Sequence, residues 1–215
     1  MGKLNMGILG GFSGTVGTVV GTITRKGDDL IRVKSKRAYT SKTEKQLNQR
    51  SKFSLVTKFM KPLNRLLKIG LKLVVGDLMS PYNYGSRNAL KKAITGTYPD
   101  YKLDYSKVII SEGELGQVKK TGFELAADNV TFSWEDDSVG TSHPTDKTVL
   151  LIYNENNHQL NYSVGVTTRV TKGGVLPLPN GEIGDNVLFY LFFQSSTEPD
   201  IVSTSQFVGS VIVTE

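Results

Sequence analysis

Few side chains in this chain are of the types that carry out catalysis or hold a metal ion. Cysteine is absent, which excludes thiolate nucleophiles, disulfides and thiolate metal sites. The only two histidines, His143 and His158, lie in polar stretches, and neither has a second histidine at the spacing of metal ligands. We therefore expect both to be exposed loop residues, and we predict no metal ion and no cofactor.

The remaining candidate motifs are incomplete. The acidic segment 135–137 (EDD) could bind a cation weakly, but it lacks the Asp-x-Asp-x-Asp-Gly spacing of a calcium loop. The glycine-rich segment 10–14 (GGFSG) resembles a phosphate-binding loop, yet no Gly-Lys-Ser/Thr follows it. A Gly-x-Ser-x-Gly nucleophile elbow is also missing. We predict that the protein is not an enzyme.

The chemistry that does stand out is positive charge, gathered in the first half of the chain. Residues 1–110 hold 21 Lys and Arg and 6 Asp and Glu, whereas residues 111–215 hold 5 and 14, within a total net charge of +6. Such polarity has three interpretations. The halves can face each other or lie apart as separate patches, copies of the chain can pair head to tail, or the basic half can bind a polyanion.

A helix over residues 43–75, with a break near Pro62, must position many of these cations. Its apolar residues recur every three or four positions: Leu47, Phe53, Val56, Phe59 or Met60, Leu63 and Leu66. Proline lacks the amide hydrogen and clashes with the preceding turn, which explains the expected break. The candidate residues for contact with a polyanion or another subunit are Arg32, Lys34, Lys36, Arg37, Lys52, Lys58, Arg65 and Lys68.

The remainder of the basic half is predicted to hold a glycine-rich strand and hairpin over residues 7–37 and a shorter helix over 85–94. Thr and Val at 15–24 favour a strand, and alternation over 30–36 favours a second strand after the turn at 26–29 (KGDD). Residues 1–110 thus form a basic N-terminal region. For residues 2–14 we predict contact with another subunit, with a disordered tail as the alternative.

The sequence pattern of the acidic half, residues 111–215, predicts short strands separated by turns. The strands are expected at 130–134, 148–153, 160–166, 187–194 and 207–214. Trp134 on an early strand and Tyr153 on the next are typical of an immunoglobulin-like or fibronectin-III-like sandwich, and the absence of cysteine favours the latter. The predicted fold class is α+β, mostly β: an N-terminal hairpin and helices followed by an antiparallel sandwich.

Four segments together resemble a family from Bacteroidota known as DUF6266, whose function is unknown. They are residues 10–17 (GGFSGTVG), 43–53 (TEKQLNQRSKF), 93–99 (AITGTYP) and 104–108 (DYSKV). The C-terminal half matches mainly in its strand pattern and in the ending 209–213 (GSVIV). The resemblance implies no established activity and no catalytic residues.

These observations lead to a hypothesis of a non-enzymatic structural protein that self-assembles into a filament, tube or particle. Its contacts would run head to tail, from the basic N-terminal half of one copy to the acidic sandwich of the next. The alternative is a nucleic-acid or polyanion-binding module, and a third, drawn from the sandwich alone, is an adhesion or carbohydrate-binding module. No signal peptide or membrane span is evident, so we expect a cytoplasmic protein or part of a released particle.

Overall fold

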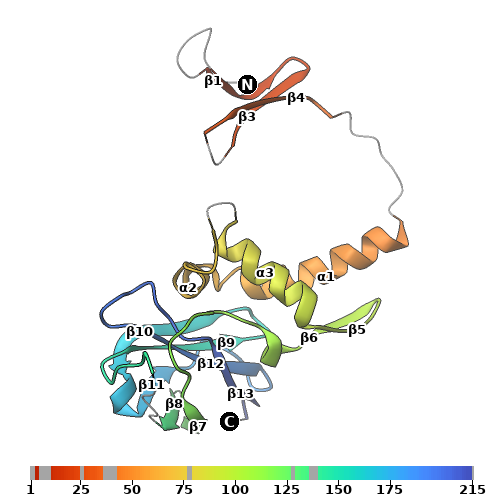
Figure 1. Ribbon diagram of the computed structural model, residues 1–215. Coiled ribbons are helices and arrows are strands. Elements are labelled where there is room, and N and C mark those ends of the chain that lie inside the picture. The colour runs from red at the N-terminus through yellow and green to blue at the C-terminus, as the bar shows by residue number, and fades with distance from the viewer. Residues whose placement is uncertain are drawn as a thin grey trace. The chain divides into compact units, whose positions relative to one another are not determined.

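A computed structural model describes residues 3–4, 11–24, 27–35, 43–76, 79–126, 129–135 and 140–214. The chain divides into two compact units, Met1–Thr43 and Glu44–Glu215 (Figure 1). Charge had suggested a division after residue 110, whereas contacts group the helices with the sandwich. The two units are described separately below.

The first unit holds a small antiparallel sheet with the strand order β1-β2-β3-β4. Its strands are β1 (Lys3–Leu4), β2 (Phe12–Val16), β3 (Val19–Ile23) and β4 (Asp29–Val33). The predicted hairpin is present, because β3 pairs with β4 from Val19 opposite Val33 to Ile23 opposite Asp29. Of the arm assigned to intersubunit contact, β1 pairs with β2 of the same chain, and residues 5–10 lie outside the described residues.

Three helices open the second unit: α1 (Glu44–Met60), α2 (Asn64–Gly70) and α3 (Pro81–Lys92). The break expected at Pro62 is confirmed, since the chain turns at residues 61–63 between α1 and α2. Helix α3 begins four residues earlier than predicted. Its start is fixed by Ser80, whose hydroxyl accepts a hydrogen bond from the Asn83 amide at 3.2 Å, and by Pro81 in the first turn.

A short hairpin joins the helices to the sandwich. It consists of β5 (Ile94–Thr97) and β6 (Asp100–Leu103), and the 3-10 helix η1 (Tyr105–Lys107) follows it. This hairpin was not predicted, because each of its strands has only four residues.

The remaining strands form two antiparallel sheets, which confirms the predicted α+β class with a C-terminal sandwich. The four-stranded sheet has the order β10 (Leu160–Thr168), β9 (Lys147–Asn154), β12 (Asn186–Gln194) and β13 (Gln206–Ile212). The three-stranded sheet has the order β11 (Gly173–Pro177), β8 (Asn129–Glu135) and β7 (Lys119–Ala126). A 3-10 helix, η2 (Arg169–Thr171), separates β10 from β11.

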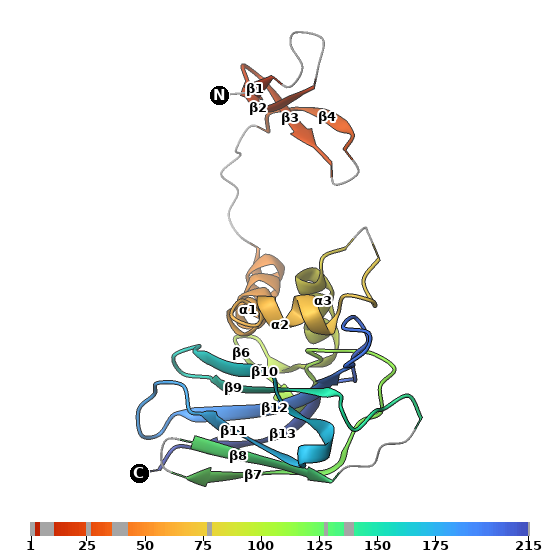
Figure 2. The ribbon, with the colours of Figure 1, turned by 90° about the vertical axis from the view of Figure 1, so that its left-hand side faces the viewer.

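The helices cover the outer face of the four-stranded sheet, so the second unit has three layers (Figure 2). On the helical side, Phe59 and Leu63 pack in one cluster with Leu151 and Tyr190 of the sheet. On the other side, the two sheets enclose a second cluster that includes Trp134. Strands β9 and β12 are therefore buried on both faces, and the predicted sandwich is covered on one side.

The apolar stripe predicted on α1 is buried along only part of its length. Leu47 and Phe53 belong to this stripe, but 36% of Leu47 and 51% of Phe53 are exposed. The buried stripe begins only at Val56, where α1 reaches the sheet, and it continues through Met60. The first part of α1 runs past the sheet and has α3 and β6 beside it instead.

Candidate functional site

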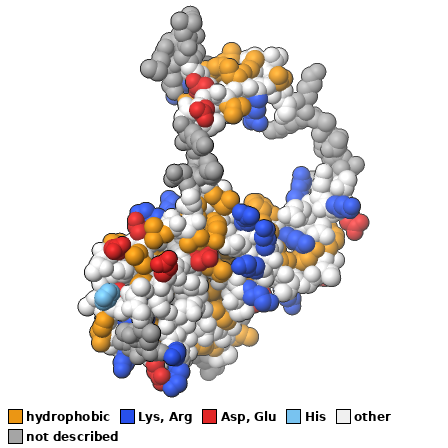
Figure 3. All heavy atoms as spheres, viewed as in Figure 1, with side chains coloured by type: hydrophobic (Ala, Val, Ile, Leu, Met, Phe, Trp, Pro, Cys, Tyr) orange, Lys and Arg blue, Asp and Glu red, His pale blue; other side chains and the backbone are white. Residues whose placement is uncertain are grey.

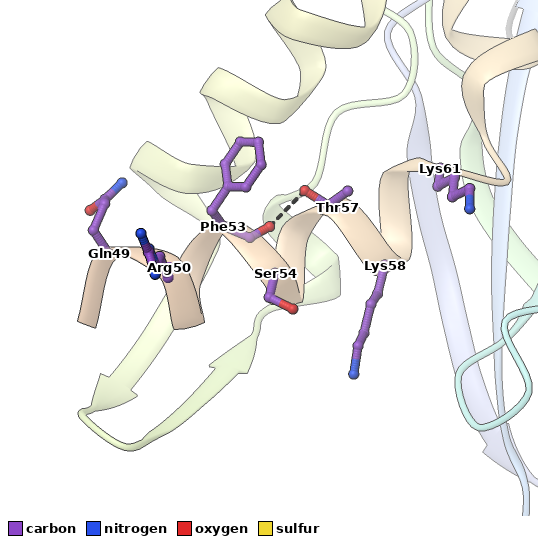
Figure 4. Close-up of a pocket in the computed structure, with 7 residues that line it drawn as sticks. All are labelled: Gln49, Arg50, Phe53, Ser54, Thr57, Lys58 and Lys61. Atoms are coloured by element: carbon purple, nitrogen blue, oxygen red, sulfur yellow. Dashed lines mark hydrogen bonds between the residues drawn. The ribbon is translucent and has the colours of Figure 1, made fainter. Parts of the chain in front are cut away.

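The candidate site is a surface on the helices, centred on the exposed side of α1. Seven residues line a shallow depression of about 610 Å³ there, as Figure 4 shows: Gln49, Arg50, Phe53, Ser54, Thr57, Lys58 and Lys61. Positions three and four apart lie on one face of a helix, which brings these residues together. The Thr57 hydroxyl donates a hydrogen bond to the Phe53 carbonyl at 2.7 Å. The Phe53 ring points away from the helix, as Figure 4 shows.

The Phe53 ring borders a second depression as well. This one has a volume of about 350 Å³ and is lined on the α3 side by Tyr82, Asn83, Ser86, Arg87, Leu90 and Lys91. An exposed aromatic ring thus lies between two groups of cations, one from α1 and one from α3. We call this surface the α1–α3 face and define it by Arg50, Phe53, Lys58, Lys61, Arg87 and Lys91.

Of the predicted contact residues, Lys58 is the one that lies on the α1–α3 face. Lys52 instead places its ammonium group 4.8 Å from the centroid of the Tyr101 ring on β6. Arg65 on α2 donates from Nη1 to the Tyr162 hydroxyl of β10 at 3.3 Å. Lys68 is exposed on α2.

The other predicted residues belong to the first unit. Arg32 lies on β4 and Lys34 directly follows it, and both are exposed. Lys36 and Arg37 lie outside the described residues. Of the eight predicted residues, Lys52, Lys58, Arg65 and Lys68 therefore belong to the second unit, and Arg32 and Lys34 to the first.

Sequence reasoning left Arg50 and Lys61 out of the candidate set, although helical spacing offered a signal for both. Arg50, Ser54 and Lys58 follow one another at four-residue steps, as do Phe53, Thr57 and Lys61. This exposed row was overlooked because Phe53 was counted with the apolar stripe of the helix. Nothing in the sequence placed Arg87 and Lys91 beside it, because that neighbourhood depends on how α3 packs against α1.

Positive charge dominates the α1–α3 face and the helices that carry it. Residues 44–93 hold eleven Lys and Arg against two acidic residues, and Figure 3 shows these cations along the helices with apolar side chains between them. Ammonium and guanidinium groups bind carboxylates and phosphates, and an exposed ring adds apolar or stacking contact. Among the described residues, no cluster of His, Asp or Glu could hold a metal ion, and no helix is long and apolar enough to span a membrane.

The buried charges of the sandwich serve its packing. Arg169 Nε lies 3.6 Å from Asp146 Oδ2, with both side chains fully buried. The guanidinium group also donates from Nη2 to the Gly116 carbonyl at 2.8 Å and lies 4.1 Å from the Phe193 ring centroid. These contacts tie the loop before β7 to the sandwich core, away from solvent, and we do not include them in the site.

Three comparisons place the chain among known proteins. A search of curated protein sequences returned no significant match. Among solved structures, the fn3 domain of human contactin 1 aligns with a TM-score of 0.30 and 8% sequence identity, covering 48% of this chain and 85% of that one. Residues 11–209 match the family described as "Family of unknown function (DUF6266)". Because this match spans most of the sequence, the chain belongs to the DUF6266 family.

Proposed function

We propose that this protein is a non-enzymatic structural protein that self-assembles. In this proposal, the basic N-terminal half of one copy, including the α1–α3 face, contacts the acidic sandwich of the next copy. Contacts of this head-to-tail kind extend into filaments or close into rings, depending on the rotation between neighbours.

The observation that carries the proposal is that the described part of the N-terminal sheet buries almost no side chain. Of the residues described between 11 and 35, only Gly21 is buried. Five large apolar side chains are more than 40% exposed: Val16, Ile23, Leu30, Ile31 and Val33. A sheet gains stability mainly by burying one face, so such a surface is typical of an element that packs against a partner.

Charge supports the same arrangement. The sandwich carries exposed carboxylates on several separate strands and loops: Glu114, Glu124, Glu135, Glu182 and Glu198. These face solvent on a half with nine more acidic than basic residues, whereas the helices carry the opposite excess. Complementary surfaces of this kind favour encounter and fix register, and salt weakens them.

Sedimentation and negative-stain microscopy of the purified protein test the proposal. We expect ordered assemblies at low salt that dissociate at high salt. The double variant Lys58→Glu/Lys61→Glu should abolish them. The control Lys172→Glu, an exposed residue of the sandwich, changes charge in the same sense and should have little effect. A protein that stays monomeric at high concentration and low salt contradicts the proposal.

The second candidate function is polyanion binding by the α1–α3 face. The exposed Phe53 ring among cations favours it, since aromatic rings beside basic residues stack on nucleotide bases. A filter-binding titration with single-stranded DNA over a range of salt concentrations measures it. Affinity should fall steeply with salt, because phosphate contacts release counterions, and Phe53→Ala should weaken binding at every salt concentration. No binding near physiological salt rules this candidate out.

A further inference from the structure

Strand β4 is an open and apolar sheet edge. Within the described residues, its only pairing partner is β3. All five of its residues are exposed, with 49% of Leu30, 63% of Ile31 and 77% of Val33 accessible. Natural edge strands are usually short, twisted away or protected by lysine and proline, because an exposed edge is a template for pairing. On β4 itself the only basic residue is Arg32.

The hydrogen bonds at either end of the β3–β4 ladder show which backbone groups remain open. The Lys34 amide donates to the Thr18 carbonyl at 2.8 Å, and the Thr24 amide donates to the Asp28 carbonyl at 2.8 Å. Backbone groups of an antiparallel strand alternate in direction along the chain, so even-numbered residues of β4 point toward β3. The N–H and C=O groups that point outward belong to Asp29, Ile31 and Val33.

We propose that β4 pairs in antiparallel fashion with β4 of a second copy, across a two-fold axis at Ile31. This register places Ile31 opposite Ile31, and Asp29 opposite Val33 on each side of the axis. It pairs the whole strand and joins the outward-pointing groups of both copies, so the two four-stranded sheets become one continuous sheet.

The side chains suit this register. On the even-numbered face, Asp28 of each copy lies opposite Lys34 of the other, which forms two pairs of opposite charge. Between them, Leu30 lies opposite Arg32, whose aliphatic stem can pack over it. Cross-strand pairs of opposite charge and apolar pairs are each stabilising relative to alanine pairs. Moving the axis to Arg32 would place Arg32 opposite Arg32, and moving it to Leu30 would pair Asp28 with Arg32 but leave Lys34 without an acidic partner.

This contact is distinct from the head-to-tail contact of the proposed function. A two-fold contact joins identical surfaces and closes on itself, whereas a head-to-tail contact joins different surfaces. Backbone pairing is also far less sensitive to salt than contact between exposed charges. The two contacts can therefore be tested independently, and the strand pairing is tested at about 1 M salt, where the Debye length is only about 3 Å.

Cysteine cross-linking measures the register directly, because the chain has no native cysteine. In the full-length Ile31→Cys variant, the two cysteines face each other with Cα atoms about 5.5 Å apart, within the range of a disulfide. In the control Val33→Cys, they are four residues apart along the sheet, roughly 13 Å, and cannot be joined. Both positions are exposed on the same strand face, so the variants should fold equally well.

We expect mild oxidation to convert the Ile31→Cys variant to a covalent dimer, and the Val33→Cys variant to remain mostly monomeric on non-reducing gels. Adding Ile31→Pro to Val33→Cys gives the background of random collision, because proline removes the outward amide at the axis. Equal cross-linking of the two single variants overturns the proposed register. If neither single variant cross-links above that background, the β4 pairing itself is overturned. The salt-sensitive head-to-tail assembly is tested separately, by sedimentation and microscopy.

Discussion

Three tyrosine hydroxyls lie where the helices meet the four-stranded sheet. The Phe59 ring of α1 packs edge-on against the Tyr153 ring, with centroids 4.8 Å apart. The Tyr190 hydroxyl donates a hydrogen bond to the Tyr105 carbonyl at 2.9 Å, and the Tyr153 hydroxyl and His158 Nδ1 share a hydrogen bond at 2.9 Å. Burial is the main factor that raises the pKa of all three phenols far above 10.

These shifts predict that the fold loses stability at high pH. The unfolded tyrosines ionise near pH 10, while the three folded phenols stay protonated. Because the folded pKa values are the higher ones, the stabilisation is fully present below about pH 10 and is lost progressively above it. Absorbance of tyrosinate during a pH titration should show a late step of three ionisations that coincides with unfolding.

The variant Tyr190→Phe provides the control for that titration. It should reduce the late-ionising group from three to two, with a modest cost in stability from the lost hydrogen bond, about 1 kcal/mol. Ionisation of all nine tyrosines in one step before unfolding would contradict the burial of these phenols.

Phe53 shows why the site was only partly predictable from single residues. Periodicity correctly placed Val56, Leu63 and Leu66 in the core, each with no exposed surface. The same periodicity also included Phe53, because it reports which side of a helix is apolar but not how far the covering layer extends. Exposure of Phe53 depends on where α1 passes beyond the sheet, which is a property of the tertiary structure. Lys58 was identified from charge alone.

At the scale of elements, the sequences of the two central strands indicate that both of their faces are covered. Residues 148–153 (TVLLIY) of β9 and 187–193 (VLFYLFF) of β12 are almost continuously apolar, and all of these residues are buried. Such runs are typical of strands that are covered on both faces. Strand spacing was enough to predict the sandwich. The helical layer could also have been predicted, because these apolar runs need cover on a second face and the apolar part of the first helix can supply it.

Strands β7 and β11 were missed for a different reason. Strand β11 has two glycines and ends at Pro177, and β7 begins with lysines and pairs through a bulge near Gly122. Both are edges of the smaller sheet and are only partly buried. Edge strands have one pairing partner and a weak apolar pattern, so their positions are decided by pairing with β8.

The end of α2 depends on a close backbone approach that Gly70 permits. A Cβ atom at this position would lie 2.5 Å from Ser111 Cβ and 2.6 Å from the Ile110 carbonyl oxygen. The Gly70 carbonyl also accepts a hydrogen bond from the Glu112 amide at 3.0 Å. We expect Gly70→Ala to lower the free energy of unfolding by about 1–3 kcal/mol, because α2 must shift away from this segment. Urea denaturation measures the change.

Gly76 provides the matched control for this substitution. No atom of the described residues lies within 4 Å of a Cβ added there, and its backbone is not left-handed. Gly76→Ala should leave stability unchanged or raise it by up to about 1 kcal/mol through the unfolded state. If both variants behave alike, the close docking of α2 is not a determinant of stability.

At the scale of the whole molecule, charge and compactness divide the chain at different places. Net charge changes sign near residue 110, but the helices and the sandwich share one apolar cluster and belong to one unit. Part of the opposite charge is paired within that unit, as between Lys72 Nζ and Asp200 Oδ1 at 2.6 Å. This pair is exposed and contributes little stability.

The division into units predicts that residues 44–215 fold alone. All described members of both apolar clusters lie in this range, so removing residues 1–43 leaves the contacts within these clusters intact. We expect the fragment to unfold cooperatively with a melting temperature within a few degrees of that of the full chain, since no core packing is lost.

The fragment should also remain monomeric at low salt, because it lacks the N-terminal sheet with its exposed apolar side chains and its strand β4. Calorimetry and sedimentation of the same sample measure both properties. A fragment that melts far below the full chain would show that the N-terminal unit supports the core. A fragment that still assembles would assign the contact to the α1–α3 face and the sandwich alone.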